Sequence, residues 1–252
     1  MKNVMPVTGG ILAMLLLWSL GAWWLATPLL LPGPLETVQR ALALTLSGEL
    51  PQHILSSLVR LLVALLVGVP AGAVLGCALG RWAALDAMVN PFVRMFNSIP
   101  AIALVPFSLL LFGVSEISRY ALLFYTVSLT VLLSARQGVR SVPGLRLRAA
   151  QMLGLSQRAI FFRVILPSCV PQILAGTRTA VGLGVMVVVA AEMLGADSGV
   201  GYLIMQARSQ FDVGNLMTGI LTLGGLSIML DRVFVLGSEK LLPRWSPKYR
   251  IR

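Results

Sequence analysis

Long apolar stretches bounded by charged residues alternate along the chain. A helix needs about 20 mostly apolar residues to cross a bilayer, whose hydrocarbon core is about 30 Å thick. Several stretches meet or approach this length, so the pattern predicts an all-α polytopic membrane protein with about six transmembrane helices. We place these helices at residues 11–31, 61–80, 98–112, 120–135, 179–194 and 213–236.

The first apolar stretch contains no charge from residue 3 to residue 35. A cleaved signal peptide is the alternative interpretation, but the apolar segment of a signal peptide spans only about 7–15 residues. An uncleaved helix with an interfacial aromatic belt is also favoured by Trp18, Trp23 and Trp24. We therefore expect residues 1–56 to form an N-terminal transmembrane helix with an outer loop, and residues 57–252 to form the core of the protein.

Composition supports this class, because 57% of the residues are hydrophobic, 12% are charged and the mean hydropathy is +0.88. The net charge of +11 could also suggest nucleic acid, but the basic residues flank apolar stretches and no aromatic residues are interleaved with them. Cytoplasmic loops retain Lys and Arg. Threading the helices from a cytoplasmic N-terminus leaves most basic residues on the cytoplasmic side, so we expect both termini to be cytoplasmic.

Residue counting excludes several kinds of catalytic and metal site. A zinc metallopeptidase helix needs two histidines, and the chain has only His53, which we expect to be solvated or interfacial. None of the three lysines stands in the Gly-Lys-Ser/Thr order of a nucleotide-binding phosphate loop. Cys77 and Cys169 lie in apolar contexts that favour buried packing over metal binding. We therefore predict no catalytic residue, metal site or cofactor in this chain.

Glycines recur every four residues along the second apolar stretch, at Gly68, Gly72, Gly76 and Gly80. This spacing places them on nearly one helix face. Helices in lipid associate through such small residues, and we favour packing within the chain over a contact with another subunit. A second strip of small residues is formed by Gly176, Ala180 and Gly184.

A basic loop, residues 136–178, separates the fourth and fifth apolar stretches. After Pro143-Gly144, residues 145–153 have helical composition, and Gly154-Leu155-Ser156 predicts a helix stop followed by an N-cap serine. A second helix over residues 157–166 then leads to Pro167. Two interpretations remain open from these residues alone: an interfacial hairpin with snorkelling arginines, or a turn of little bulk that another protein approaches closely.

The order of residues in this loop resembles the coupling loop of ATP-binding-cassette (ABC) importer permeases, which reads roughly Glu-Ala-Ala, three residues, Gly, about nine residues, then Ile-x-Leu-Pro. The matching positions are Ala149-Ala150, Gly154 and Val164 to Pro167. Most of the remaining chain is similar to the sulfonate, taurine and nitrate permease subfamily, on the residues at 97–106, 112–113, 191–203 and 244–247.

The resemblance implies a type I ABC importer transmembrane domain, in which this loop docks on an ATPase subunit. The coupling residues implied here are Arg148, Ala149, Ala150, Gly154, Leu155, Ile165, Leu166 and Pro167. One residue departs from the family pattern, because Arg148 stands where the family has glutamate. We therefore expect an acidic residue opposite Arg148 on the partner.

The resemblance also implies the partners and location: a second permease copy, two cytoplasmic ATPase subunits that bind ATP and Mg, an extracytoplasmic binding protein, and the lipid of a bacterial inner membrane. The permease itself would do no covalent chemistry. The implied substrate is a small solute, with a sulfonate, taurine or a nitrate-like anion favoured. The alternatives are a non-transporting membrane scaffold or, less favoured, a secondary transporter, since the sequence has no evident inverted repeat or central charged relay.

Polar residues in or beside the apolar stretches are candidates for the translocation path. An ionisable residue in a span is by default a functional candidate, but Glu192 lies near the outer end, where bracing of the following turn is the favoured interpretation. The full candidate set is Asn97, Ser98, Ser134 and Glu192.

Overall fold

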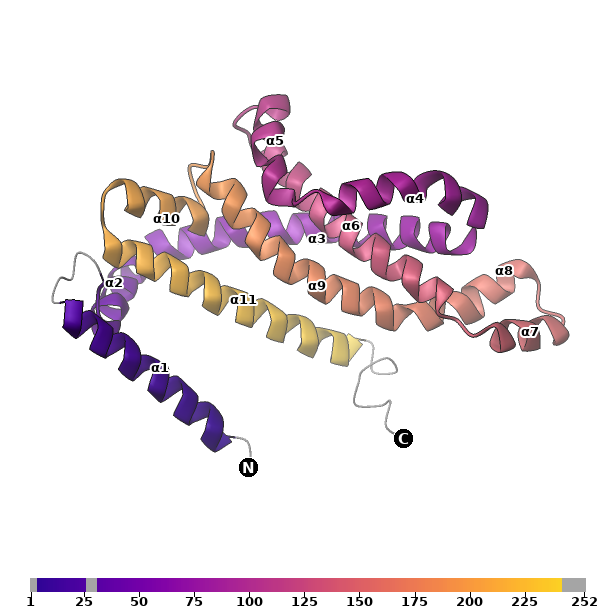
Figure 1. Ribbon diagram of the computed structural model, residues 1–252, viewed down its shortest axis with the longest axis horizontal. Coiled ribbons are helices and arrows are strands. Elements are labelled where there is room, and N and C mark those ends of the chain that lie inside the picture. The colour runs from indigo at the N-terminus through magenta and orange to yellow at the C-terminus, as the bar shows by residue number, and fades with distance from the viewer. Residues whose placement is uncertain (1–3, 26–30, 242–252) are drawn as a thin grey trace. The chain divides into compact units, whose positions relative to one another are not determined.

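In the computed structural model, residues 4–25 and 31–241 are described, and within these ranges the secondary structure is helical, with no strand (Figure 1). The all-α class is therefore confirmed. The elements in chain order are α1 Val4–Leu25, α2 Pro34–Leu46, α3 Glu49–Arg81, α4 Ala83–Ser98, the 3-10 turn η1 Ala101–Leu104, α5 Val105–Phe112, α6 Glu116–Arg140, α7 Gly144–Met152, α8 Gln157–Ile160, the π-helical turn η2 Phe161–Ile165, α9 Leu166–Met193, α10 Val200–Ser209 and α11 Val213–Leu241.

Helices long and apolar enough to cross a membrane confirm the polytopic class. Among the described residues there are four: Glu49–Arg81, Glu116–Arg140, Gln157–Met193 and Val213–Lys240. A fifth span results if the bent pair Ala83–Ser98 and Ala101–Phe112 is counted as one. The first predicted span falls on α1, whose apolar segment Leu12–Leu25 is shorter than these, and residues 26–30 lie outside the described part of the chain.

The third predicted span, residues 98–112, corresponds to η1 with α5 but was incomplete, because helix α4 precedes it. The chain forms α4 and then η1 with α5, at an angle of 88°. Ile99 and Pro100 both have extended backbones at the bend. Proline lacks an N–H donor and disfavours a helical conformation in the residue before it, which accounts for the break at this position.

The fifth predicted span, residues 179–194, starts far too late. One long apolar helix runs from Gln157 to Met193, and Pro167 and Pro171 do not end it. The ring of Pro167 would clash with the carbonyl of Arg163 in a regular helix, but Arg163 lies in the π-helical turn η2, where the backbone is wider. Arg178, which the pattern assigned to a loop, therefore lies within a spanning helix.

The helices form two compact units. The first contains residues 1–58 and 192–225, and the second contains residues 59–191 and 226–252. In the first unit, Leu44 of α2, Leu50 of α3 and Leu203 of α10 form a small buried core. The core of the second unit is larger, and its completely buried members include Val105, Leu123, Val127 and Val131.

The glycine strip of α3 packs against α6 inside the second unit, so the predicted packing within the chain is confirmed. A methyl group added to Gly72 would meet the Ser128 carbonyl and Val131, and one added to Gly76 would meet the Leu132 carbonyl and Ala135. The strip therefore lets two helix backbones approach closely. In the same unit, Gly176 of α9 packs against Ser134, and Gly184 packs against Leu61. Cys77 and Cys169 are buried free thiols, as predicted.

Candidate functional site

The loop between α6 and α9 has the turn that its sequence predicts. Helix α7 ends at Met152, and two residues later Gly154 has a φ of +76°, a left-handed conformation that glycine adopts readily. The N–H of Leu155 donates to the Ala150 carbonyl at 3.2 Å, and this bond closes the end of the helix. Ser156 then caps α8, because its hydroxyl accepts the N–H of Ala159 at 3.3 Å. The predicted glycine stop and serine N-cap are both confirmed.

The implied coupling residues divide into two sets by burial. Ala150 and Ile165 are buried in a cluster that also contains Val139 of α6 and Cys169 of α9. Leu155, Leu166 and Pro167 are half-buried, whereas Arg148, Ala149 and Gly154 are exposed. The buried set fixes the turn to the ends of two spanning helices, α6 and α9, and the exposed set leaves one surface of the turn uncovered in this chain (Figure 1).

The tip of this turn carries exposed apolar side chains that the sequence pattern did not single out. Met152 and Leu153 are 90% and 81% exposed, and Leu145 at the other end of α7 is similarly uncovered. Next to them, an open groove is lined by Ala149, Leu153, Leu155, Val164 and Pro167, among others, with Arg146 and Arg163.

Two polar contacts anchor the helices that carry the turn. Buried Asp86 of α4 forms ion pairs with Arg136 and Arg140 of α6, and Arg136 Nη2 donates to Asp86 Oδ2 at 2.8 Å. At the end of α3, Arg81 Nη2 donates to Gln157 Oε1 of α8 at 2.7 Å. The sequence pattern predicted neither contact, and it assigned Arg136 and Arg140 to a loop.

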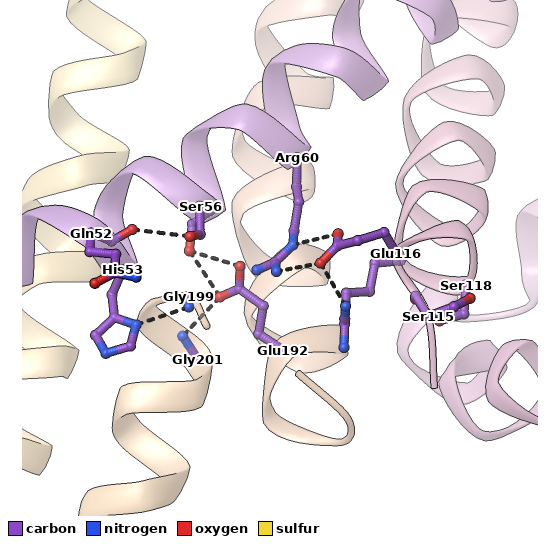
Figure 2. A network of polar contacts seen from close by, with 12 residues as sticks. Gln52, His53, Ser56, Arg60, Ser115, Glu116, Ser118, Glu192, Gly199 and Gly201 are labelled. Atoms are coloured by element: carbon purple, nitrogen blue, oxygen red, sulfur yellow. Dashed lines mark hydrogen bonds and ion pairs between the residues drawn. The ribbon is translucent and has the colours of Figure 1, made fainter. Parts of the chain in front are cut away.

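Glu192 lies in the first unit, where its carboxylate takes part in a cap of helix α10 (Figure 2). Three successive backbone N–H groups at the start of α10 donate to side chains: Gly199 to His53 Nδ1 at 3.1 Å, Val200 to Ser57 Oγ at 3.0 Å, and Gly201 to Glu192 Oε2 at 2.9 Å. Such N–H groups have no partner within their own helix. An anionic side chain is also favourable at the positive end of the helix dipole.

The surroundings of this cap correct one sequence expectation. His53 is buried and packs beside Tyr202, with 5.7 Å between the ring centroids, so it is not a solvated or interfacial histidine. Since Nδ1 accepts the Gly199 N–H, the imidazole is in a form that leaves Nδ1 unprotonated. Gly199 has a φ of +120°, and a methyl group there would meet the Glu192 carboxyl group. Glycine is therefore required at this position.

The other proposed path residues lie on different elements. Asn97 and Ser98 are exposed in the last turn of α4, and the Ser98 hydroxyl donates to the Arg94 carbonyl at 3.0 Å. Ser134 is half-buried in α6 against Gly176 and donates to the Thr130 carbonyl at 3.0 Å. Both serine hydroxyls thus bond to the preceding turn of their own helix.

Three further ion pairs were not foreseen. Glu116 at the start of α6 accepts from Arg60 of α3 at 2.6 and 2.9 Å and from Arg119 at 2.7 Å (Figure 2). Arg178 of α9 pairs with Asp231 of α11. Across the described ranges, no group of three or more His, Cys, Asp or Glu side chains could hold a metal ion.

Comparisons with known proteins agree on one family. The family described as "Binding-protein-dependent transport system inner membrane component" matches residues 68–245. The taurine transport system permease protein TauC of Escherichia coli (strain K12) is 31% identical over 245 residues, which cover 94% of this chain and 88% of that protein. SsuC of the same organism, whose name assigns it provisionally to aliphatic sulfonates transport, is 34% identical over 93% of this chain and 89% of its own.

The fold is similar to that of a solved transporter structure. A chain of the MetNI methionine ABC transporter, in an inward-facing conformation, matches with a TM-score of 0.55 and 18% identity, over 86% of this chain and 96% of that chain. This likeness concerns the fold alone, whereas the family match and the TauC relationship extend over most of the sequence. The chain therefore belongs to the binding-protein-dependent transport system inner membrane components, the permease subunits of ABC importers.

Proposed function

We propose that this permease imports a small organic or inorganic anion, and that ATP hydrolysis by separate cytoplasmic subunits drives the import through the turn at residues 141–167, which contains α7, α8 and η2. The observation that carries this proposal is the division of that turn into a buried and an exposed set. Ala150 and Ile165 pack among residues of α6 and α9, while Arg148, Ala149 and Gly154 remain uncovered. A force applied to the exposed surface would therefore reach two spanning helices directly.

The exposed surface has the chemistry of a docking site. Met152 and Leu153 supply apolar area at the tip. Covering this area with another protein surface removes it from water and so makes a favourable contribution to the free energy of binding. The adjacent groove has basic residues, Arg146 and Arg163, along its apolar lining. We propose that an ATPase subunit covers this tip, with ATP and Mg bound on that subunit, and that Leu155, Leu166 and Pro167 support the turn from behind.

Arg148 reverses the charge that the family pattern has at the start of this surface. It is exposed on α7, so a carboxylate on the ATPase can reach it. We propose that pairing. The Arg148→Glu substitution, tested with the native ATPase, should weaken copurification and lower ATPase coupling. Unchanged assembly and coupling would show that the pair does not exist.

The proposed substrate class follows from the named relatives, which are associated with taurine and aliphatic sulfonates. The complete transporter would contain a second copy of this chain, two ATPase subunits and an extracytoplasmic binding protein that delivers the anion. We propose that both termini are cytoplasmic. We also retain the division into an N-terminal helix with its loop, residues 1–56, and a core permease domain, residues 57–252.

We propose that Glu192 braces the start of α10 rather than contacting the substrate. Its carboxylate is already engaged by Ser57 and the Gly201 N–H, and an acid is a poor direct ligand for an anion. The polar residues Asn97, Ser98 and Ser134 remain candidates for the wall of the path.

Assembly is the first test of the proposed function. The chain, carrying an affinity tag, is purified from cells that co-express the products of neighbouring genes. We expect an ATPase subunit to copurify in equal amount with the chain. If no ATPase copurifies with the intact chain, the ATP-driven mechanism is contradicted.

A further inference from the structure

A two-point ion pair joins helices α9 and α11 in the second unit. Arg178 Nε donates to Asp231 Oδ1 at 2.6 Å, and Arg178 Nη2 donates to Asp231 Oδ2 at 2.8 Å. In spite of this pairing, the two side chains are 55% and 42% exposed in the chain. The Arg178 guanidinium group is thus paired with one carboxylate, that of Asp231, and it is still accessible to an additional ligand.

Arg178 lies within the spanning helix Gln157–Met193, beside two other apolar helices. Gly176 packs against Ser134 of α6, and Gly184 packs against Leu61 of α3. Both partners lie in charge-free stretches, residues 120–135 of α6 and 61–80 of α3. Arg178 lies between Gly176 and Gly184 along α9. The stretch in α3 has 20 residues and is about 30 Å long in a helix, the thickness of the hydrocarbon core, whereas the one in α6 has 16 residues and is about 24 Å long.

A charged pair between two spanning helices is not expected to remain in contact with lipid. Ionisable side chains inside membrane proteins face the bundle interior or a water-filled cavity, because exposure to hydrocarbon is costly. The exposed face of α9 around Arg178 is formed mostly by small or unbranched side chains, Ala175, Thr179, Gly182 and Met186, together with Leu183, which is 39% exposed. A methyl group added to Gly182 would meet no atom within 4 Å. This face thus leaves room for a ligand beside the guanidinium group and offers it no carboxylate besides Asp231.

We infer that Arg178 is an anion-binding residue of the translocation path, and that Asp231 is the internal carboxylate that occupies it when no substrate is present. This inference rests on the proposed function, an anion importer. A guanidinium group presents its N–H donors in a planar fork that fits two oxygens of one anion. A sulfonate or nitrate offers the same pair of oxygens as the Asp231 carboxylate.

Competition between Asp231 and the substrate for Arg178 allows the site both to bind the anion and to release it. A transport site has to bind its ion strongly enough to admit it and weakly enough to release it. An unpaired arginine in an apolar layer would hold an anion too tightly. Because Asp231 pairs with the same guanidinium group, the anion replaces the Asp231 carboxylate when it binds. When the anion leaves, Arg178 and Asp231 form a neutral ion pair again.

The test uses the assembled complex in proteoliposomes, with its ATPase and binding protein, and radiolabelled taurine and nitrate as probes. We expect Arg178→Gln to assemble normally and to lose uptake by about tenfold or more, because it removes charge-assisted hydrogen bonds. The double variant Arg178→Gln, Asp231→Asn is the deciding one. It restores electrical neutrality but not the anion site, so we expect uptake to remain low. Arg232→Gln, on the neighbouring residue of α11, is the matched control and should retain uptake.

Recovery of uptake in the double variant, or full uptake in Arg178→Gln, would overturn the inference while leaving the importer intact. Absence of uptake in the unaltered complex across both anions would instead count against the proposed function. If the complex that carries Arg178→Gln does not assemble, the Asp231→Asn variant provides the deciding test of the inference. The freed arginine should lower the KM for the anion and slow its release, and unchanged kinetics would contradict the inference.

Chemical labelling gives a second measurement that needs no transport. In a background in which Cys77 and Cys169 are replaced by Ser, Arg178→Cys should react with a water-soluble methanethiosulfonate reagent, and taurine should slow the reaction. Leu66→Cys, on an exposed position of α3, should remain unlabelled in lipid. No labelling at position 178, or a disulfide between two copies there, would place the residue in lipid or at a subunit interface and overturn the inference.

Discussion

The Ser57 hydroxyl donates to both carboxylate oxygens of Glu192, at 2.8 and 2.9 Å, and also accepts the N–H of Val200. One serine on α3 thereby links the end of α9 to the start of α10. Both Ser57 and Glu192 are almost completely buried. A buried polar network of this kind is stabilising only while all its members keep their partners.

Glu192→Gln should therefore destabilise the protein by about 1–3 kcal/mol, because its NH2 group replaces one carboxylate oxygen that accepts from Ser57, and the negative charge at the start of α10 is lost. Ser57→Ala should have a comparable effect, since the substitution removes the acceptor of the Val200 N–H. Thermal unfolding of the purified complex in detergent measures both. Normal assembly and melting of Glu192→Gln with loss of uptake would instead assign Glu192 to gating or substrate contact.

The packing of α3 on α6 predicts a difference between two glycines. Gly72→Val should prevent folding or strongly lower the yield of chain in the membrane, because its side chain would meet the Ser128 carbonyl and Val131. Gly224→Val, on α11, should be tolerated, since a methyl group there meets no atom within 4 Å. Membrane yield and monodispersity in detergent distinguish the two. Equal behaviour of the two variants would contradict the close packing.

Substitutions at two neighbouring alanines of α7 should distinguish an effect on docking of the ATPase from an effect on folding of the chain. Ala149 is exposed and Ala150 is buried. We expect Ala149→Glu to fold normally but to lose most copurifying ATPase. We expect Ala150→Glu to destabilise the chain itself, because it buries an unpaired carboxylate. The ATPase-to-permease ratio and the melting temperature are measured for each. Full ATPase retention in Ala149→Glu would exclude this surface as the docking site.

The buried Asp86 ion pairs should contribute more to the stability of the protein than the more exposed ion pair between Arg40 and Asp212. Removing one member of a buried ion pair is strongly destabilising, so Asp86→Asn should lower the melting temperature by about 5 °C or more. Asp212→Asn is the matched control, since its 3.9 Å pair with Arg40 is more exposed, and should change little. Similar melting of both variants would mean that Arg136 and Arg140 find other partners.

Local patterns in the sequence predicted local features well. The apolar stretches predicted the spanning helices, the four-residue glycine spacing predicted the packing of α3 on another helix of the chain, and Gly154 with Ser156 predicted the turn after α7. Each of these depends on residues close together in sequence. The conformation that Gly154 adopts and the cap that Ser156 forms are determined within a few residues.

Features that depend on distant partners were not predictable in the same way. Hydropathy alone placed Arg178 in a loop, because one charge interrupts an apolar run, and did not show that Asp231 pairs with it from α11. It also left His53 apparently free, although the Gly199 N–H, 146 positions later, donates to its ring. The start of a helix at Pro100 was predicted, but not the preceding helix α4 or the 88° bend between the two, since Pro100 by itself shows only where a helix can begin.

ATP-dependent uptake tests the central claim most directly. The complex of this chain with its copurifying ATPase is reconstituted in proteoliposomes, the binding protein is added, and labelled taurine and nitrate are followed with and without ATP. We expect accumulation of at least one anion that requires ATP and is lost in Ala149→Glu. Uptake by this chain alone, driven by an ion gradient, or an assembled complex that takes up no solute from a broad panel, would contradict the account.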